Sequence, residues 1–82
     1  MLKLLYFASL RETLGVAGEE IDASACADIR ALRAQLAARG GVWTVFATSK
    51  SLRAAVNQAM AGADAGVKDG DEIAFFPPVT GG

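Results

Sequence analysis

The sequence predicts an α+β domain in which one main helix packs on one face of a small mixed sheet. Three observations favour this class: β-forming segments lie near both ends of the chain, one amphipathic helical segment lies between them, and further short apolar segments follow it. A chain of 82 residues is enough for a single domain with one apolar core. Hydrophobic residues make up 52% of the chain and charged residues 21%, which is typical of a globular protein.

The first predicted elements are a strand over residues 2–8 and a short second strand over residues 19–23, which pair as a hairpin. Residues 9–18 between them are expected to form a loop held in place by Leu10 and Leu14. Alternation along the first strand places two sets of side chains on opposite faces, namely Leu2, Leu4, Tyr6 and Ala8 on one and Lys3, Leu5 and Phe7 on the other.

A helix is predicted over residues 29–39. Asp28 is a good N-cap residue, and Gly40 with Gly41 ends the helix. Apolar residues at positions i, i+3 and i+7 form one stripe that faces the sheet, namely Ile29, Leu32 and Leu36. The helix therefore supplies one side of the core.

The second half of the chain predicts the rest of the sheet. Residues 42–47 are expected to form a helical turn or an irregular segment, and a strand follows over residues 52–57. A short edge strand is expected at residues 59–61. A turn at residues 67–71 then leads into the last strand at residues 72–76.

Composition argues against several classes of partner. The net charge is −1 and there is no basic cluster, so neither nucleic acid nor an anionic membrane is expected as the main partner. The apolar runs are too short to span a bilayer, and the first three residues do not begin a signal sequence. A single cysteine fits a reducing cytoplasm.

The side chains offer few catalytic groups. The chain has no histidine, which removes the usual general base and the commonest metal ligand. Cys26 lies among acidic residues and is expected to be an inert, at least partly buried thiol. Asp69, Asp71 and Glu72 flank a turn glycine and are expected to be solvated carboxylates rather than metal ligands. If the chain takes part in a reaction, the reactive group is expected at a terminus.

The C-terminal segment suits that role. Residues 1–76 are predicted to form the folded domain, and residues 77–82 an extended tail that ends in Gly81-Gly82. Pro77 and Pro78 favour an extended course, so the tail spans about 20 Å when straight. Its end is thin enough for the Gly82 carboxylate to enter a pocket of another protein. The alternative is an ordinary frayed end.

A partner-binding face is predicted from apolar residues that point both ways. Leu5 and Phe7 lie opposite the inward residues of the first strand, and Phe75 and Phe76 must point in opposite directions. Because one helix covers only one face of a sheet, some of these side chains are left for a partner. The alternative is that the loops at residues 9–18 or 62–66 cover them.

Three segments carry a family resemblance: residues 4–12, 54–58 and 69–82. The most specific part is the octet Phe-Phe-Pro-Pro-Val-Thr-Gly-Gly at residues 75–82, because a bare Gly-Gly ending is shared by ubiquitin-like proteins in general. The chain resembles the small subunit of molybdopterin synthase, a family of ubiquitin-like sulfur-carrier proteins with a β-grasp fold. The resemblance covers essentially the whole chain.

The resemblance implies a sulfur carrier in molybdenum cofactor biosynthesis. An activating enzyme uses ATP and Mg²⁺ to adenylate Gly82, and a sulfur donor protein converts the adenylate to a thiocarboxylate. The large subunit of molybdopterin synthase then receives the sulfur for cyclic pyranopterin monophosphate, in a heterotetramer of two small and two large subunits. The chain itself is implied to be a non-catalytic, cytoplasmic subunit that holds no permanent cofactor or metal.

The resemblance also assigns residues. Gly82 is the reactive group, and the tail residues that bind in a partner's channel are Gly81, Thr80, Val79, Pro78 and Pro77. The expected docking residues on the folded domain are Phe7, Leu5, Phe76 and Arg11. The alternatives are a sulfur carrier of another pathway, such as thiamine thiazole synthesis, a ubiquitin-like modifier that joins Gly82 to lysines, and a plain binding module with an idle tail.

Overall fold

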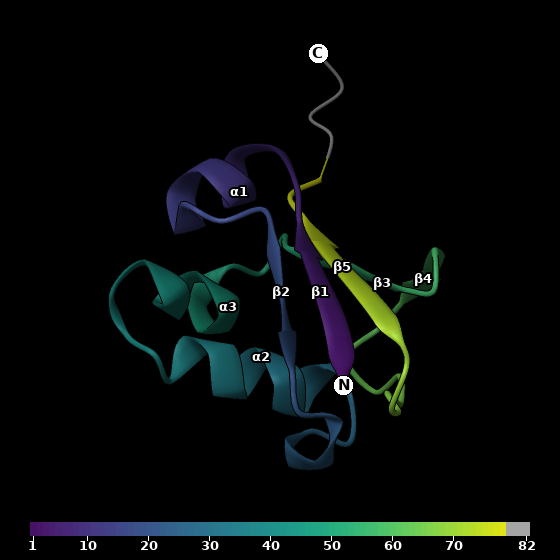
Figure 1. Cartoon of the computed structure of the whole chain (residues 1–82). Coiled ribbons are helices and arrows are strands. Elements are labelled where there is room, and N and C mark those ends of the chain that lie inside the picture. The colour runs from purple at the N-terminus through teal and green to yellow at the C-terminus, as the bar shows by residue number, and fades with distance from the viewer. Residues whose placement is uncertain (79–82) are drawn as a thin grey trace.

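The computed structural model describes residues 1–78, apart from the side chain of Ala25 (Figure 1). Within these residues, five strands form one mixed sheet in the order β2-β1-β5-β3-β4. β1 and β5 are parallel neighbours at its centre, and the other pairs are antiparallel. The strands are β1 (Leu2–Tyr6), β2 (Gly18–Ile21), β3 (Arg53–Val56), β4 (Ala59–Ala61) and β5 (Glu72–Phe76). The predicted α+β class with a small mixed sheet is confirmed.

The main helix is α2 (Ile29–Ala37), and the predicted N-cap is confirmed. The Asp28 carboxylate accepts a hydrogen bond from the Ala31 N–H at 2.8 Å. The backbone N–H groups of the first two helical residues, Ile29 and Arg30, have no acceptor within the helix. They donate to the backbone carbonyls of residues 65 and 63, at 3.0 and 2.9 Å respectively. The segment after β4 therefore covers the start of α2, and the three residues of the predicted apolar stripe are buried.

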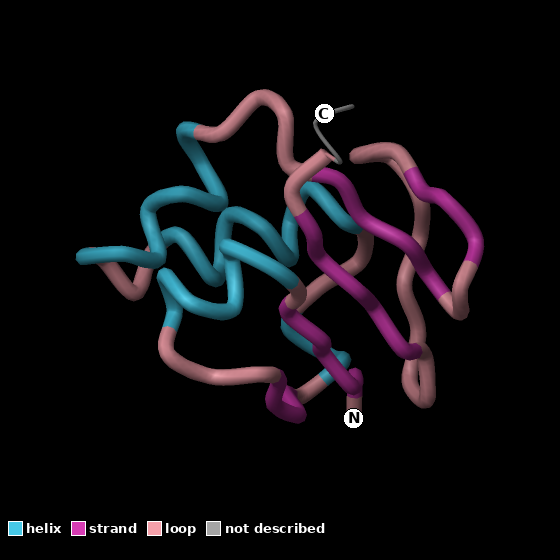
Figure 2. Tube along the Cα trace, turned by 90° about the horizontal axis from the view of Figure 1, so that it is seen from above, coloured by secondary structure: helices cyan, strands magenta, loops and turns pink. Residues whose placement is uncertain are grey.

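The helices lie on one side of the sheet. Figure 2 shows them gathered beside the strands, and Figure 1 shows α2 below the shorter helices. The shorter helices are α1 (Ala8–Leu14) and α3 (Val45–Thr48), and single 3-10 turns lie at η1 (Ala23–Ala25) and η2 (Gly41–Thr44). Within residues 1–78, no helix is long and apolar enough to cross a membrane.

The loop predicted at residues 9–18 is wrong, because most of it forms α1. This helix begins at Ala8, which has a positive φ of 55°, and no side chain caps its first turn. Alanine rarely adopts a positive φ, and a helix without a capping side chain has no N-terminal sequence signal. The sequence therefore does not predict α1. Leu10 and Leu14 are buried, as expected, and Gly15 ends the helix with a φ of 79°.

An aromatic cluster fills the space between the sheet and the short helices. Tyr6 of β1 lies within 6.5 Å, centroid to centroid, of Trp43, Phe46 and Phe75. Phe46 and Phe75 meet edge to face at 5.1 Å. Such pairs pack favourably beyond their buried area, so the cluster joins β1 and β5 to α3.

A polar network adjoins this cluster. The Tyr6 hydroxyl donates to Glu19 of β2 at 2.9 Å, and the Arg39 guanidinium donates to both oxygens of Glu19 at 2.7 and 2.8 Å. Arg39 also lies over the Trp43 ring at 4.4 Å. Arg39 holds the pKa of Glu19 below its usual range, while burial, with the Glu19 contact, raises the pKa of Tyr6. The network ties the β1–β2 hairpin to the segment after α2.

The prediction of solvated carboxylates is wrong for Asp71, which is buried. Its carboxylate accepts hydrogen bonds from the Asn57 side chain at 3.0 Å and from the Lys68 N–H at 2.9 Å. These donors lower the pKa of Asp71. Asn57 and Gln58 form the β3–β4 turn with φ of 50° and 71°. Asp71 therefore fastens this turn to the start of β5.

Candidate docking surface

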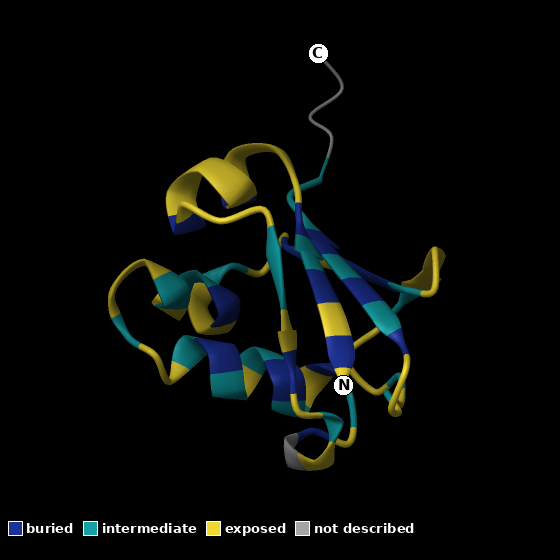
Figure 3. Cartoon of the chain, in the orientation of Figure 1, coloured by how far each residue is buried: buried dark blue, intermediate teal, exposed yellow. Residues whose placement is uncertain are grey.

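The sheet has one face that the helices do not cover, and we name it the open face. It consists of the outward-facing residues of all five strands. One row of residues in register crosses it, because Gly18 pairs with Leu5, Leu5 with Ala74, Ala74 with Ala55, and Ala55 with Met60. The row contains no charged residue. Figure 3 shows the alternation of buried and less buried residues along β1 and β5 that separates the two faces.

Several apolar side chains of the open face remain accessible. Met60 is 64% exposed and Phe7 45%, and Leu5 and Phe76 are half-buried. Neither segment that was considered as a cover lies over them. The side chains of Leu10 and Leu14 pack in the core, so α1 lies against the core. The segment after β4 accepts backbone hydrogen bonds from the start of α2. Accessible apolar surface of this kind is typical of a protein–protein interface.

The end of the sheet that leads into the tail gathers three of the four predicted docking residues. β1 and β5 run in parallel, so they end at the same edge, where the Phe7 N–H donates to the Phe75 carbonyl at 3.1 Å. Phe76 follows, and then the half-buried Pro77 and Pro78. Arg11 is exposed on α1, one turn beyond Phe7, since its N–H donates to the Phe7 carbonyl at 3.3 Å. Leu5 lies one step further along the open face.

A shallow hollow of about 250 Å³ opens beside Leu5, lined also by Lys3 and Gly18. A Cβ at Gly18 would collide with the backbone carbonyl of Leu4, so this position needs glycine. The glycine lets the backbone of β2 lie close against β1. The hollow beside Leu5 is open to an apolar side chain of a partner.

The opposite end of the open face is charged. Lys3 is in register with Glu20 on β2 and with Glu72 on β5. The face is thus mainly apolar near the tail, apart from Arg53, and charged at the far end. The apolar area that a partner could cover lies toward the base of the tail.

Four members of this surface were not predicted from the sequence: Ala55, Ala74, Met60 and Arg53. Ala55 and Ala74 form the middle of the row, and Met60 ends it. Arg53 is in register with Phe76. The alternation in the predicted strands at residues 52–57 and 72–76 contains the signal, but it gives a surface only once the strand order is known.

Two further groups singled out in the sequence are Cys26 and the carboxylates of the turn before β5. Cys26 is buried, its thiol donates to the Gln35 side chain at 2.9 Å, and burial raises its pKa. This agrees with an inert thiol. In the described part of the chain, no group of three His, Cys, Asp or Glu side chains is placed to hold a metal ion. The predicted roles of residues 79–82 lie outside the described residues.

Comparison with known proteins decides the family. The sequence matches the ThiS family over residues 4–82. The chain belongs to this family. It is 44% identical over 82 residues to the molybdopterin synthase sulfur carrier subunit of Escherichia coli (strain K12), and the match covers the whole of both chains. The protein of the same name from Haemophilus influenzae is 43% identical, again over the whole of both chains.

A solved structure of Helicobacter pylori supports the fold. It is a complex of subunits 1 and 2 of molybdopterin-converting factor, and this chain matches it with a TM-score of 0.67 at 24% identity, covering 99% of this chain and 97% of that one. At this identity the match shows the fold alone. The predicted ubiquitin-like β-grasp fold and the predicted family are confirmed.

Proposed function

We propose that the chain is the sulfur carrier subunit of a molybdopterin synthase and acts in the cytoplasm through the carboxylate of Gly82. The observation that carries this proposal is the 44% identity to the Escherichia coli sulfur carrier subunit, which extends over the whole of both chains. The open face at the base of the tail supplies the surface that such a subunit needs. The buried, free Cys26 is in keeping with a reducing compartment.

The chemistry starts from an unreactive group. A carboxylate repels nucleophiles and has no good leaving group, so an activating enzyme with ATP and Mg²⁺ first joins Gly82 to AMP and releases pyrophosphate. The terminal sulfur of a persulfide donor then displaces AMP and forms an acyl disulfide. A thiol reduces this disulfide, which releases the thiocarboxylate on Gly82 and leaves the donor in a disulfide with that thiol. The thiocarboxylate is ionised at neutral pH, and its polarisable sulfur is a good nucleophile. Gly81 adds no side chain, so the end of the tail fits a narrow channel that excludes water.

The folded domain presents this tail to the large subunit. Phe7, Phe76 and Leu5 give apolar contacts around its base, and Arg11 lies at the rim. Pro77 and Pro78 restrict the backbone where the tail leaves the sheet, which lowers the entropy lost when an extended segment binds. Val79 and Thr80 then bind in the channel as an extended peptide. Two copies of each subunit form the synthase, and each carrier delivers one of the two sulfurs of the dithiolene.

Intact-mass measurement tests the proposal. The chain is incubated with the activating enzyme, ATP, Mg²⁺, a persulfide donor and a thiol reductant. We expect the mass to rise by the difference between one sulfur and one oxygen, and we expect no change for a chain that lacks Gly82. Adding the large subunit and cyclic pyranopterin monophosphate then restores the original mass and yields the dithiolene product.

Three outcomes would contradict the proposal. Lysine-linked adducts without a thiocarboxylate would show a ubiquitin-like modifier. A thiocarboxylate that supports thiamine thiazole formation but not dithiolene formation would show a carrier of another pathway. An unmodified Gly82 would leave only a binding module.

A further inference from the structure

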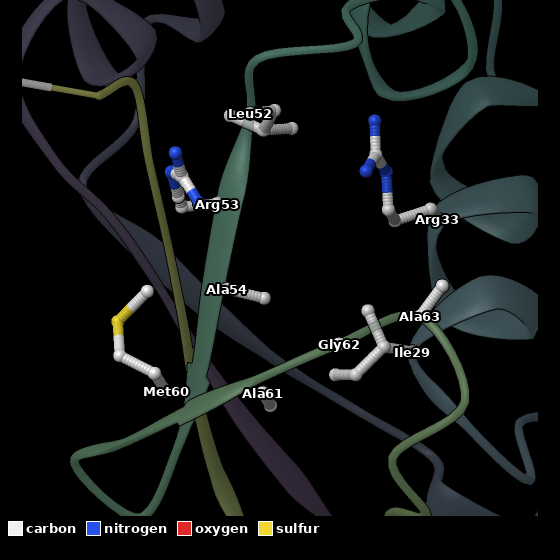
Figure 4. A pocket seen from close by; sticks show the side chains of 9 residues that line it. All are labelled: Ile29, Arg33, Leu52, Arg53, Ala54, Met60, Ala61, Gly62 and Ala63. Carbon is white, nitrogen blue, oxygen red and sulfur yellow. The ribbon is translucent and has the colours of Figure 1, made fainter.

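Arg53 places a positive charge on the open face beside the base of the tail. It begins β3 and is in register with Phe76, the last residue of β5. Figure 4 shows Arg53 and Met60 on one side of the β3–β4 ribbon and Ile29 and Arg33 on the other. Arg53 therefore belongs to the same face as the predicted docking residues.

The positive charge of Arg53 forms no ion pair among the residues that the structure describes. Within residues 1–78, the ion pairs involve the N-terminal amine, Arg30, Arg39 and Lys68, and none involves Arg53. Glu72 is the carboxylate on the neighbouring strand, but it lies four residues before Phe76, about 13 Å away along β5. Arg53 is exposed at the border of an apolar surface.

Arg33 on the other side of the ribbon is a useful contrast. Its guanidinium donates to the carbonyls of Phe46 and Ser49 at 2.9 and 2.7 Å. It is half-buried and holds the end of α3. Arg33 is thus explained by the fold, whereas Arg53 is not.

Docking on the open face changes the surroundings of Arg53. A partner that covers Phe76 and Met60 removes water from the arginine between them, and a desolvated charge without a counter-ion is unfavourable. The planar guanidinium is matched best by a carboxylate, which it binds through two parallel hydrogen bonds. Charge complementarity thus specifies what the partner carries at this point.

We propose that Arg53 is a specificity-determining residue of the docking surface and pairs with a carboxylate of the large subunit at the mouth of the channel that receives the tail. This inference rests on the proposed function, because it requires the large subunit to cover the open face. It adds to the apolar contacts a charged contact that fixes the partner's orientation, as rim charges do in other interfaces.

The test compares two charge reversals of equal size. Arg53→Glu changes the open face, and Lys50→Glu changes an exposed lysine that lines a hollow with Arg30 and Phe46 on the helix side. Binding to the purified large subunit of the same organism is measured by titration calorimetry at low and high salt. We expect Arg53→Glu to weaken binding about tenfold or more at low salt, and Lys50→Glu to change it by no more than about twofold. The difference shrinks as salt rises, because salt screens exposed charges.

Further variants separate charge from folding. Arg53→Gln retains much of the side chain and is expected to weaken binding less than Arg53→Glu. Thermal unfolding of each variant shows whether the domain is intact. Replacing the responsible acidic residue of the large subunit with lysine is expected to restore the affinity of Arg53→Glu.

Equal affinities of the two charge reversals would overturn the inference, as would a loss for Arg53→Glu that salt does not reduce. Failure of the proposed function gives a different experimental result from failure of the Arg53 inference. In that case the unsubstituted chain does not bind the large subunit and does not form a thiocarboxylate. If it does both while Arg53→Glu binds equally well, only the assignment of Arg53 is wrong.

Discussion

The two faces of the sheet differ in how deeply they bury two aromatic residues that are adjacent in the sequence. Phe75 points inward and is fully buried against Tyr6 and Phe46. Phe76, the next residue, points outward and stays half-buried beside Arg53. The inward face packs against the helices through aromatic pairs and through the hydrogen bonds of Tyr6, Glu19 and Arg39. The open face instead has small residues, Ala55 and Ala74, in the middle of its row.

The difference shows how an 82-residue chain combines a closed core with accessible apolar surface. The core uses the large side chains on one face, so the other face is free to keep accessible apolar atoms for a partner. We therefore expect stability and the proposed docking to depend on different residues. Substitutions on the two faces should separate the two properties.

The largest effect is expected from Phe75→Ala. Truncating a buried phenylalanine leaves a cavity and costs about 3–5 kcal/mol of unfolding free energy. The neighbouring change Phe76→Ala is expected to cost about 1 kcal/mol or less, because its side chain is partly exposed in the free chain. Urea denaturation followed through the single tryptophan, Trp43, measures both.

For affinity toward the large subunit, we expect the order of Phe75→Ala and Phe76→Ala to be reversed. Phe76→Ala is expected to weaken binding to the large subunit about 10- to 100-fold, as for an aromatic residue at the centre of an interface. Similar stability losses for the two variants would contradict the separation of the faces. So would unchanged binding by Phe76→Ala.

An intermediate effect is expected from Glu19→Gln on the inward side. The change removes the charge that Arg39 binds with two hydrogen bonds, and we expect a loss of about 1–2 kcal/mol at neutral pH. Because the folded chain lowers the pKa of Glu19, the stabilisation is present above the carboxyl's unfolded pKa and is lost as pH falls through the lower folded value. Urea titrations at neutral and acidic pH should show the two proteins converging in acid. A constant difference would exclude the carboxylate as the cause.

The smallest effect is expected in the β3–β4 turn, which belongs to neither face. Gln58 has a φ of 71°, a region that favours glycine in two-residue hairpin turns. Gln58→Gly is expected to stabilise the domain by about 0.5–1 kcal/mol. Gln58→Ala is the matched control, since it also removes the side chain but keeps the Cβ, and it should give no gain. Equal effects of the two changes would mean that backbone strain is not the reason.

The sequence predicted those elements whose signals are local. Asp28 and the apolar stripe from Ile29 to Leu36 define α2, and alternation defines β1 and β5. The helix α1 was missed because Ala8 begins it with a positive φ and without a cap. The strand bounds were too long by one or two residues at β1 and β3.

The candidate site was predicted in part for the same reason. Phe7 and Phe76 were found because they stand next to inward-facing residues in strong strand patterns. Arg53 and Met60 join them only through the order of the strands, which places β3 beside β5. Likewise, the burial of Asp71 depends on Asn57, fourteen residues away, and no local pattern reveals that contact.

The parallel pairing of β1 with β5 also has a consequence for synthesis on the ribosome. β5 is translated after every other described element, yet it occupies the middle of the sheet. The nascent chain cannot close its core until residues 72–76 have emerged, so folding waits for the translation of β5. A chain cut short before these residues lacks its central strand and is exposed to proteolysis.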